Sequence, residues 1–272
     1  MVANRPRASN APAVSYLAWL IALSAGFALA ERLRPARPAQ AAARPELAND
    51  LAYLALNGHV YALLTASLVG AAATLTNRAL AALGWSPATG VLAGRPFAVQ
   101  FVVALVVCDL GQWCVHNGLH RVPWLWQLHK VHHSARAMDW AVNFRFHWGE
   151  LIVYRSLLYL PVAWLGGDAG PLLAVAVFGT FWGHLNHANL DVDLGRLGYL
   201  MNGPRMHLWH HDASTEGGRH GKNFGVVLSL WDWLFGTAYW PRDRVPERIG
   251  YPGDDEMPRA WMRQLGFPFT RR

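Results

Sequence analysis

Long apolar runs separated by short polar segments dominate the chain as far as residue 181. A run without charge spans residues 13–30, a second covers 51–75, and a third covers 96–115, where Gln100 and Asp109 interrupt it. Each approaches the length of roughly 20 residues that a helix needs to cross the hydrocarbon core of a bilayer. The pattern therefore predicts an all-α protein with several membrane helices.

Two shorter apolar runs follow, at 151–165 and 172–181, and a Gly-rich turn at 166–171 separates them. This spacing predicts a helical hairpin. Its arms are short for a full crossing. We therefore expect a hairpin that either crosses the bilayer or dips into it and returns.

The first run allows two interpretations. Residues 28–30 read Ala-Leu-Ala, the small-x-small form of a signal-peptide cleavage site. The run can also be a retained membrane helix, because cations directly after an apolar segment resist translocation. Four arginines lie between residues 32 and 44, and they favour the retained helix.

Composition also favours a membrane protein. Hydrophobic residues make up 53% of the 272 residues and charged residues only 15%, whereas about 25% is usual in soluble domains. The net charge of +7 raises the question of a nucleic-acid partner. However, the arginines lie between apolar runs, so they indicate membrane topology and acidic lipid headgroups, and we expect no nucleic-acid partner.

The distribution of Lys and Arg predicts which segments share one side of the membrane. Segments 31–46 and 116–149 carry four each and 186–272 carries eleven, whereas 77–95 carries two and 166–171 none. The richer segments are expected in the cytoplasm. The fold class predicted is thus all-α, with polytopic membrane helices and a cytoplasmic helical cap.

The same patterns divide the chain into three parts. Residues 1–95 are expected to form an N-terminal membrane region with two spans, in which the Ala/Arg/Pro-rich stretch 34–45 is a linker. Residues 96–240 are expected to form a second domain, which contains twelve of the thirteen histidines. Residues 241–272 are rich in Pro, Arg and acids, which predicts a surface tail.

Histidines cluster in the second half of the chain at repeated spacings. Twelve of the thirteen lie between residues 116 and 220. They include one H-x3-H pair, one H-x2-H pair and two H-x2-H-H triplets, whose members are His116, His120, His129, His132, His133, His184, His187, His207, His210 and His211. Positions i, i+3 and i+4 share one face of a helix. Each cluster should therefore aim its imidazoles in one direction, and the four clusters can surround a cavity that holds metal.

Ten imidazoles exceed the ligand number of one metal ion, so the clusters predict two ions in a shared site. Imidazole suits iron, zinc, copper and nickel, but not calcium or magnesium. His59 stands alone and is expected to be a core residue. The roles of His147 and His220 stay open between ligand, ligand support and structure. Cys108 and Cys114 are expected to be small buried hydrophobic residues.

The ordered set of motifs resembles the fatty acid hydroxylase / sterol desaturase superfamily of membrane di-iron oxygenases, over about residues 100–240. In chain order the motifs are Asp109, HNGLHR at 116–121, WQLHKVHHS at 126–134, NFRFHWGE at 143–150, NHAN at 186–189, RMHLWHH at 205–211, NFG at 223–225 and LWDWLFGT at 230–237. Each motif is weak alone, whereas the ordered set is highly specific.

This resemblance implies two iron ions that activate O2 to hydroxylate or desaturate a lipid. It carries nine of the ten clustered histidines over as ligands. His184 belongs to a motif whose spacing varies in the family, and Trp148 stands where many members have proline, which leaves the role of His147 open. The candidates to orient the second nitrogens of the ligand imidazoles are Asp109, Asn143, Asn189 and Asp212.

The resemblance also implies partners. Two electrons per turnover must come from outside, because the sequence contains neither a G-x-G-x-x-G dinucleotide loop nor a cysteine set for an iron–sulfur cluster. We expect a ferredoxin or a cytochrome b5 type carrier with its reductase. Sterols, fatty acyl chains, carotenoids, alkylglycerols and amino-acid-containing lipids are all substrates within the superfamily, and the motifs do not separate them. Hydroxylation is expected rather than desaturation.

Two other functions compete with the oxygenase. A membrane metal carrier would use the histidines for passage and needs sites along a path through the membrane. A haem electron carrier would need only two to four axial histidines, usually inside the spans.

Overall fold

The structure, a computed structural model, describes residues 15–60, 71, 74–85, 90–214 and 221–270. These residues form helices and loops, and the only β-type pairings among them are two isolated bridges. The prediction of an all-α fold is therefore confirmed for the described part of the chain.

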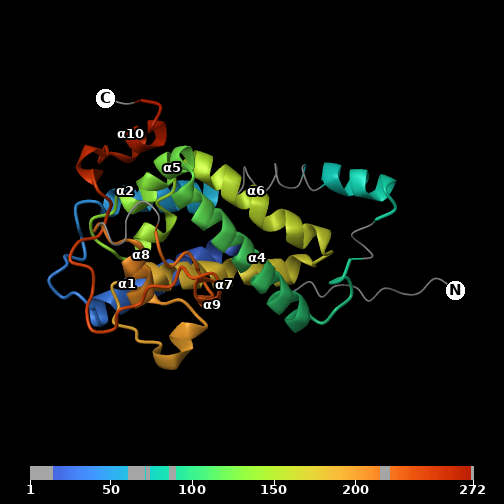
Figure 1. The fold of residues 1–272 in the computed structure, drawn as a ribbon, viewed down its shortest axis with the longest axis horizontal. Helices are drawn as coiled ribbons and strands as arrows, with labels where there is room; N and C mark the ends of the chain where they lie inside the picture. Colours follow the sequence, from blue (N-terminus) through green and yellow to red (C-terminus); the bar gives the residue numbers. More distant parts are fainter. Residues whose placement is uncertain (1–14, 61–70, 72–73, 86–89, 215–220, 271–272) are drawn as a thin grey trace.

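Four long helices form an elongated body, seen in Figure 1. They are α1 (Tyr16–Leu33), α4 (Phe97–Arg121), α6 (Trp148–Trp164) and α7 (Ala169–His187). α4 packs against α6 and α7, and α1 packs against α7. The two helices predicted for the hairpin, α6 and α7, are therefore present, and both pack against α4.

The long helices extend beyond the apolar runs that predict them. α4 continues six residues past the run at 96–115, and α7 continues from the run at 172–181 as far as His187. Hydropathy marks only the part of a helix that is apolar, whereas the backbone continues through polar residues that are buried in the protein. These extensions carry the first and third clusters of histidines, and the cap carries the second and fourth.

The structure describes only part of the second apolar run, residues 51–75. This run begins in α2 (Leu47–Ala55) and continues through the π-helix η1 (Leu56–Val60). Residues 61–70 and 72–73 lie outside the described residues. The prediction of a span over 51–75 therefore stays a prediction.

The start of α4 is fixed to the turn of the hairpin by two hydrogen bonds. The Gln100 side chain donates to the Asp168 carboxylate (2.7 Å) and accepts from the Asp168 backbone N–H (2.8 Å). Both side chains thereby satisfy polar groups that an apolar environment would otherwise leave unpaired. This explains why the polar Gln100 interrupts the apolar run of α4.

Two of the described helices, α1 and α4, are long and apolar enough to cross a membrane. Much of their apolar surface faces away from the protein: Ile21 is 61% exposed, Leu29 58%, Phe97 57% and Val102 53%. Contiguous apolar surface of this extent is uncommon on soluble proteins. The two helices therefore suggest a membrane protein.

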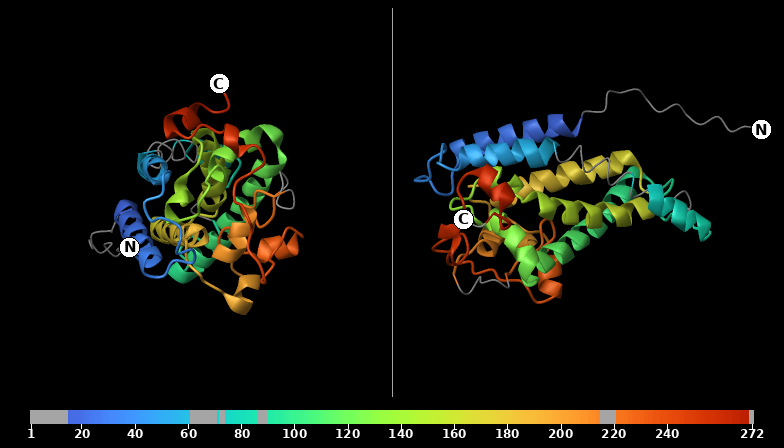
Figure 2. Two further views of the ribbon diagram at one scale, coloured as in Figure 1. Left: turned by 90° about the vertical axis from the view of Figure 1, so that its left-hand side faces the viewer. Right: turned by 90° about the horizontal axis from the view of Figure 1, so that it is seen from above.

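Short helices gather around one end of the body and form the cap (Figures 1 and 2). They are α5 (Pro123–His133), η3 (Trp140–Phe144), η4 (Gly195–Tyr199), α8 (Pro204–His210), α9 (Leu230–Leu234), η5 (Asp254–Glu256) and α10 (Trp261–Gly266). Only Val122 separates α4 from α5. This short connection brings the first two histidine motifs close together.

The stretch 34–45, predicted as a linker, is mostly exposed, but its Arg44 is buried and fixed in the cap. The buried Arg44 guanidinium donates to both carboxylate oxygens of Asp139 (2.5 and 2.7 Å) and to Asp50 (2.5 Å). Arg145, also buried, binds the other oxygen of Asp50 and pairs with Glu46 at 3.2 Å. The partners of Arg44 and Arg145 lie up to 99 residues away in sequence, so local composition could not predict this network.

The tail 241–272 is also more than a surface segment. Tyr251 and Met257 are buried in a cluster with Tyr53, Trp126 and Val131. The Gly250 N–H donates to the backbone carbonyl of His211 (2.8 Å). The tail is mostly polar in composition, but its few apolar residues, such as Tyr251 and Met257, pack onto the cap beside the histidines.

Candidate metal centre

Nine of the ten candidate histidines gather in two adjoining groups at the cap end of α4. Within each group the ring nitrogens that could bind a metal all lie within 4.8 Å of one another. We call them the five-histidine group (His116, His120, His129, His133 and His210) and the four-histidine group (His132, His187, His207 and His211). All nine side chains are buried.

The two groups are in direct contact. The rings of His133 and His211 stack with centroids 4.4 Å apart, and those of His129 and His132 lie 5.2 Å apart. Two ions bound in the groups would therefore be neighbours in one cavity, as the number of imidazoles predicts.

Each H-x2-H-H triplet contributes to both groups, which corrects the expectation that a cluster aims its imidazoles in one direction. On α5, His129 and His133 join the five-histidine group and His132 joins the other. At about 100° per residue, positions i and i+4 differ by about 40°, whereas i+3 and i+4 differ by about 100°. The second triplet, around α8, divides in the same way, with His210 as the separate member.

Hydrogen bonds at the second nitrogen fix the tautomers in the four-histidine group. His187 Nδ1 lies 2.7 Å from the carbonyl oxygen of Gly183, and His132 Nδ1 lies 3.3 Å from that of Arg145. A carbonyl only accepts, so both protons are on Nδ1 and both Nε2 atoms carry a lone pair. These two Nε2 atoms are 3.2 Å apart, and neither can donate to the other.

The five-histidine group repeats this arrangement. His116 Nδ1 donates to the Phe224 carbonyl (2.8 Å), and His129 Nδ1 donates to the Glu150 carboxylate (2.8 Å). The Nε2 atoms of His116 and His129 lie 3.1 Å apart, again with lone pairs facing each other. His210 Nδ1 donates to the Lys222 carbonyl (2.7 Å), which leaves its Nε2 as a further lone pair.

Opposed lone pairs in a buried site require a cation between them. A transition-metal ion binds imidazole nitrogen at about 2.0–2.1 Å, so nitrogens about 3.1–3.2 Å apart suit neighbouring positions around one ion. Both ring nitrogens of His120 and of His211, and Nε2 of His133, have no hydrogen-bond partner among the described residues. Buried polar atoms without a partner are rare, so the donor set fits metal ions in both groups.

Burial keeps these imidazoles neutral. It lowers the pKa of His129 to about 3. Burial, together with the neighbouring His187 and His132 rings respectively, holds the pKa values of His207 and His211 well below the ordinary range. Neutral rings keep the lone pair that a metal needs.

Comparison with known protein families identifies the chain. The model of the fatty acid hydroxylase family matches residues 101–237, half of the chain. This chain belongs to the fatty acid hydroxylase family. The matched residues include all nine grouped histidines. The resemblance inferred from the motifs is therefore confirmed.

Named relatives of this family member act on lipids, as their names state. The chain is 32% identical to ornithine lipid hydroxylase from Rhizobium tropici over 65% of its own length and 52% of that protein. It is 29% and 28% identical to alkylglycerol monooxygenases from Danio rerio and Homo sapiens, over 55% of its length and 33% of theirs. The chain thus spans about half or less of the curated relatives it matches. No solved structure matches it significantly.

His184 is separated from the other nine candidates. It is buried, but its Nε2 lies 3.2 Å from Ser24 Oγ of α1, and its Nδ1 donates to the Trp140 carbonyl at 3.0 Å. It lies one turn before His187 and about 60° around α7, where it contacts α1 and η3 instead of the grouped histidines. The structure thus brings nine of the ten predicted ligands together, and His184 is not among them.

The histidines outside the clusters also lie apart from the centre. His147 binds the Leu265 carbonyl through Nε2 (3.0 Å) and accepts from the Gly149 N–H, which is a structural role. His59 is half-buried in η1 and belongs to neither group. His220 lies outside the described residues. Cys108 is buried as predicted, whereas the prediction is wrong for Cys114, which is exposed.

None of the four polar residues predicted to orient the metal ligands is hydrogen-bonded to a grouped histidine among the described residues. Asp212 accepts from Ser214, and Asn189 binds the backbone of Arg37. Asn143 contacts only the ring of His184 (3.3 Å). Backbone carbonyls orient most of the hydrogen-bonded imidazoles instead. Sequence motifs do not identify such carbonyls.

Asp109 supports the metal ligands indirectly, through the backbone that orients them. Its carboxylate accepts from the backbone N–H groups of Val227 and Leu228 and from the Trp231 indole, each at 2.9 Å. Asp232 similarly accepts from the Phe224 and Gly225 N–H groups (2.8 and 2.9 Å). Together they fix the segment 222–231, whose carbonyls orient His116 and His210.

The orienting residue that sequence reasoning missed is Glu150. It is fully buried at the start of α6, and its carboxylate is the partner of His129. The signal in the sequence was a single acidic residue in the first turn of the mostly apolar helix α6.

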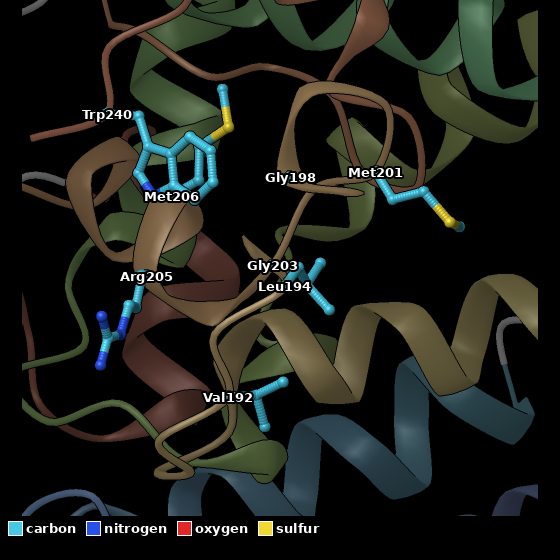
Figure 3. Close-up of a pocket in the computed structure, with 8 residues that line it drawn as sticks. All are labelled: Val192, Leu194, Gly198, Met201, Gly203, Arg205, Met206 and Trp240. Atoms are coloured by element: carbon cyan, nitrogen blue, oxygen red, sulfur yellow. The ribbon is translucent and has the colours of Figure 1, made fainter. Parts of the chain in front are cut away.

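A cavity beside α8 is too small for a lipid. Figure 3 shows its lining residues, which come from η4, α8 and the loops beside them: Val192, Leu194, Gly198, Met201, Gly203, Arg205, Met206 and Trp240. Its volume of about 10 Å³ leaves room for about one water molecule. A Cβ at Gly198 would overlap the Trp240 ring, so this glycine permits the close packing of Trp240 on η4.

Proposed function

We propose that this chain is a membrane-bound oxygenase that hydroxylates a C–H bond of a lipid, with O2 as co-substrate and two iron ions held by the two histidine groups. The observation that carries the proposal is the pair of opposed Nε2 lone pairs in each group, His116 with His129 and His132 with His187. Family membership supports iron among the metals that imidazole favours.

When bound, iron would supply the O2 activation that an unactivated C–H bond requires and that acid–base side chains do not provide. The chain's own residues perform the supporting steps. Glu150 and four backbone carbonyls hold five of the nine imidazoles in the tautomer that offers Nε2. The low exposure of the nine rings excludes water from the site.

The names of the relatives guide the choice of substrate. One is called a hydroxylase of ornithine lipid and the others monooxygenases of alkylglycerol. We therefore propose hydroxylation rather than desaturation, on a lipid with a polar head and a long chain. A metal carrier is disfavoured, because the nine histidines converge on one closed site instead of following a path along the helices.

The proposed location is a multi-pass membrane protein with its centre on the cytoplasmic side. The apolar helices α1 and α4 and the distribution of arginines support this arrangement. Electrons would come from an external ferredoxin or a cytochrome b5 type carrier with its reductase.

The test is a comparison of lipids from membranes with and without the protein. With isotope-labelled O2 and a reductant, we expect an ornithine lipid or an alkylglycerol lipid to gain one labelled oxygen atom. His132→Ala should abolish the product, whereas His59→Ala, a histidine outside both groups, should retain it. Full activity in His132→Ala, or an unlabelled product, would contradict the proposal.

A further inference from the structure

An exposed apolar patch covers two short helices of the cap. Its members are Leu197 (47% exposed), Tyr199 (53%), Leu200 (46%), Leu230 (39%), Trp233 (40%), Leu234 (65%) and Phe235 (51%). We call them the η4–α9 patch. Single exposed apolar residues are ordinary, but seven large ones on two adjoining elements indicate a contact surface.

The patch is held on a fixed backbone. The Leu230 N–H donates to the Leu200 carbonyl (3.4 Å), and the Ser229 hydroxyl donates to the Gly198 carbonyl (2.8 Å). The rings of Tyr199 and Trp233 lie 5.1 Å apart. The two helices therefore present one surface rather than two separate ones.

The inward side of α9 explains why its apolar residues point outward. Asp232 is fully buried and accepts from the Trp113 indole of α4 (2.9 Å) as well as from the Phe224 and Gly225 N–H groups. With Asp232 committed to the interior, the neighbouring Trp233 and Leu234 must face away. Polar side chains would be expected there if the surface met only water.

The depth of the patch follows from its contact with α4. The Phe235 ring lies 4.7 Å from that of Trp113. Trp113 is 16 residues after Phe97, where α4 begins, and at 1.5 Å per residue this is about 24 Å along the helix. The hydrocarbon core is about 30 Å thick, so a membrane crossed by α4 would have its surface close to this level.

Charged and aromatic residues at the edge of the patch suit a membrane surface. The Arg242 guanidinium stacks over the Trp240 ring (4.3 Å), and that ring contacts Tyr199 (5.8 Å). Arg196 is exposed beside Leu197. Trp and Tyr prefer the headgroup level, where cations also meet anionic lipid. The nearby Asp193 is offset by Arg205 and Arg242.

We propose that η4 and α9 lie in the membrane surface, with the η4–α9 patch inserted at the boundary between headgroups and acyl chains. The inference rests on the proposed membrane location of α4. It goes beyond the proposed reaction, because it gives the cap its own lipid contact. Through Asp232 this contact would hold the Phe224 carbonyl, which orients His116, at the membrane surface.

Depth-dependent fluorescence quenching tests the inference. In full-length protein with Cys108→Ala and Cys114→Ser, an environment-sensitive fluorophore is attached at Leu234→Cys, at Val102→Cys on α4, or at Val245→Cys on the tail. Val245 is 63% exposed, against 65% for Leu234, so it is a matched control. Each variant is reconstituted in vesicles of phosphatidylcholine and phosphatidylglycerol that contain lipids spin-labelled near the headgroup, and its unchanged metal content checks its fold.

We expect strong quenching at residues 234 and 102 and little at 245. Quenching at 102, with position 234 no more quenched than 245, would overturn the inference and leave the membrane location of α4 intact. A blue-shifted but unquenched probe at 234 would also overturn it, because a protein such as a second copy would then cover the patch. Absence of quenching at 102 would contradict the proposed membrane location itself.

Discussion

Single hydrogen bonds set the direction in which five of the nine grouped imidazoles offer their lone pairs. Four of the partners are backbone carbonyls, at Phe224, Arg145, Gly183 and Lys222. The fifth, Glu150, is a side chain and can therefore be changed without altering the backbone. It is the position at which the role of such bonds can be measured.

Glu150→Ala should weaken metal binding by about 10–100-fold, the usual effect of losing a residue that orients a ligand. His129 would lose the acceptor that fixes its tautomer. Glu150→Gln keeps an accepting oxygen at the same place and should retain most of the affinity. Chelator competition on the purified variants measures this; equal affinity in Glu150→Ala and the wild type would refute the role.

His184 and His187 lie one turn apart on α7 and should respond differently to replacement. His187→Ala should lower the bound metal, because its Nε2 lies among those of the four-histidine group. His184→Ala should leave the metal content unchanged and only reduce stability, through the lost contacts with Ser24 and Trp140. Elemental analysis of both variants decides; loss of metal in His184→Ala would restore it as a ligand.

At the scale of elements, the apolar runs and motifs predicted the helices well, and their packing less well. α1, α4 and the hairpin follow from hydropathy, because a membrane or a buried site needs apolar residues there. The burial of Arg44 in the stretch 34–45 and of Tyr251 in the tail could not be predicted, since both residues have partners far away in sequence.

The candidate site shows the same division. The spacing of the motifs singled out all nine grouped histidines, because a helix fixes the relative directions of the side chains at positions i, i+3 and i+4. It could not predict that His132 and His133 serve different groups, or that carbonyls rather than Asp109 orient the rings. The division of the rings between the groups depends on how the helices pack. The orienting carbonyls belong to the backbone, which every residue carries, so residue types do not identify them.

The buried ion network is the element-scale feature with the largest expected cost of removal. Asp50→Ala would leave the guanidinium groups of Arg44 and Arg145 short of a partner, and breaking a buried pair typically costs about 3–5 kcal/mol. Denaturation in detergent should show this loss. Asp255→Ala, which removes an exposed partner of Arg136, is the matched control and should change stability little; equal effects would contradict the account.

At the scale of the whole molecule, the cap is closed around the histidines by segments from both ends of the chain. The apo protein buries opposed lone pairs, so metal binding should stabilise the fold as well as complete the site. At a free metal concentration about 100 times the Kd, each ion would add about 2.7 kcal/mol. The midpoint of thermal unfolding should therefore rise with iron and fall with a chelator.

The double variant His116→Ala with His187→Ala, which removes one member of each opposed pair, should lose most of this response to iron. His59→Ala should keep it. If a chelator left the wild-type midpoint unchanged, the two groups would not be metal sites that the fold depends on.

The central claim is that the two histidine groups hold two iron ions. Its most direct test is elemental analysis of the detergent-purified protein, expressed with iron supplied. We predict about two irons per chain. Two ions of another metal would preserve the two-centre site but contradict iron, and one ion or none would contradict the two-centre site itself.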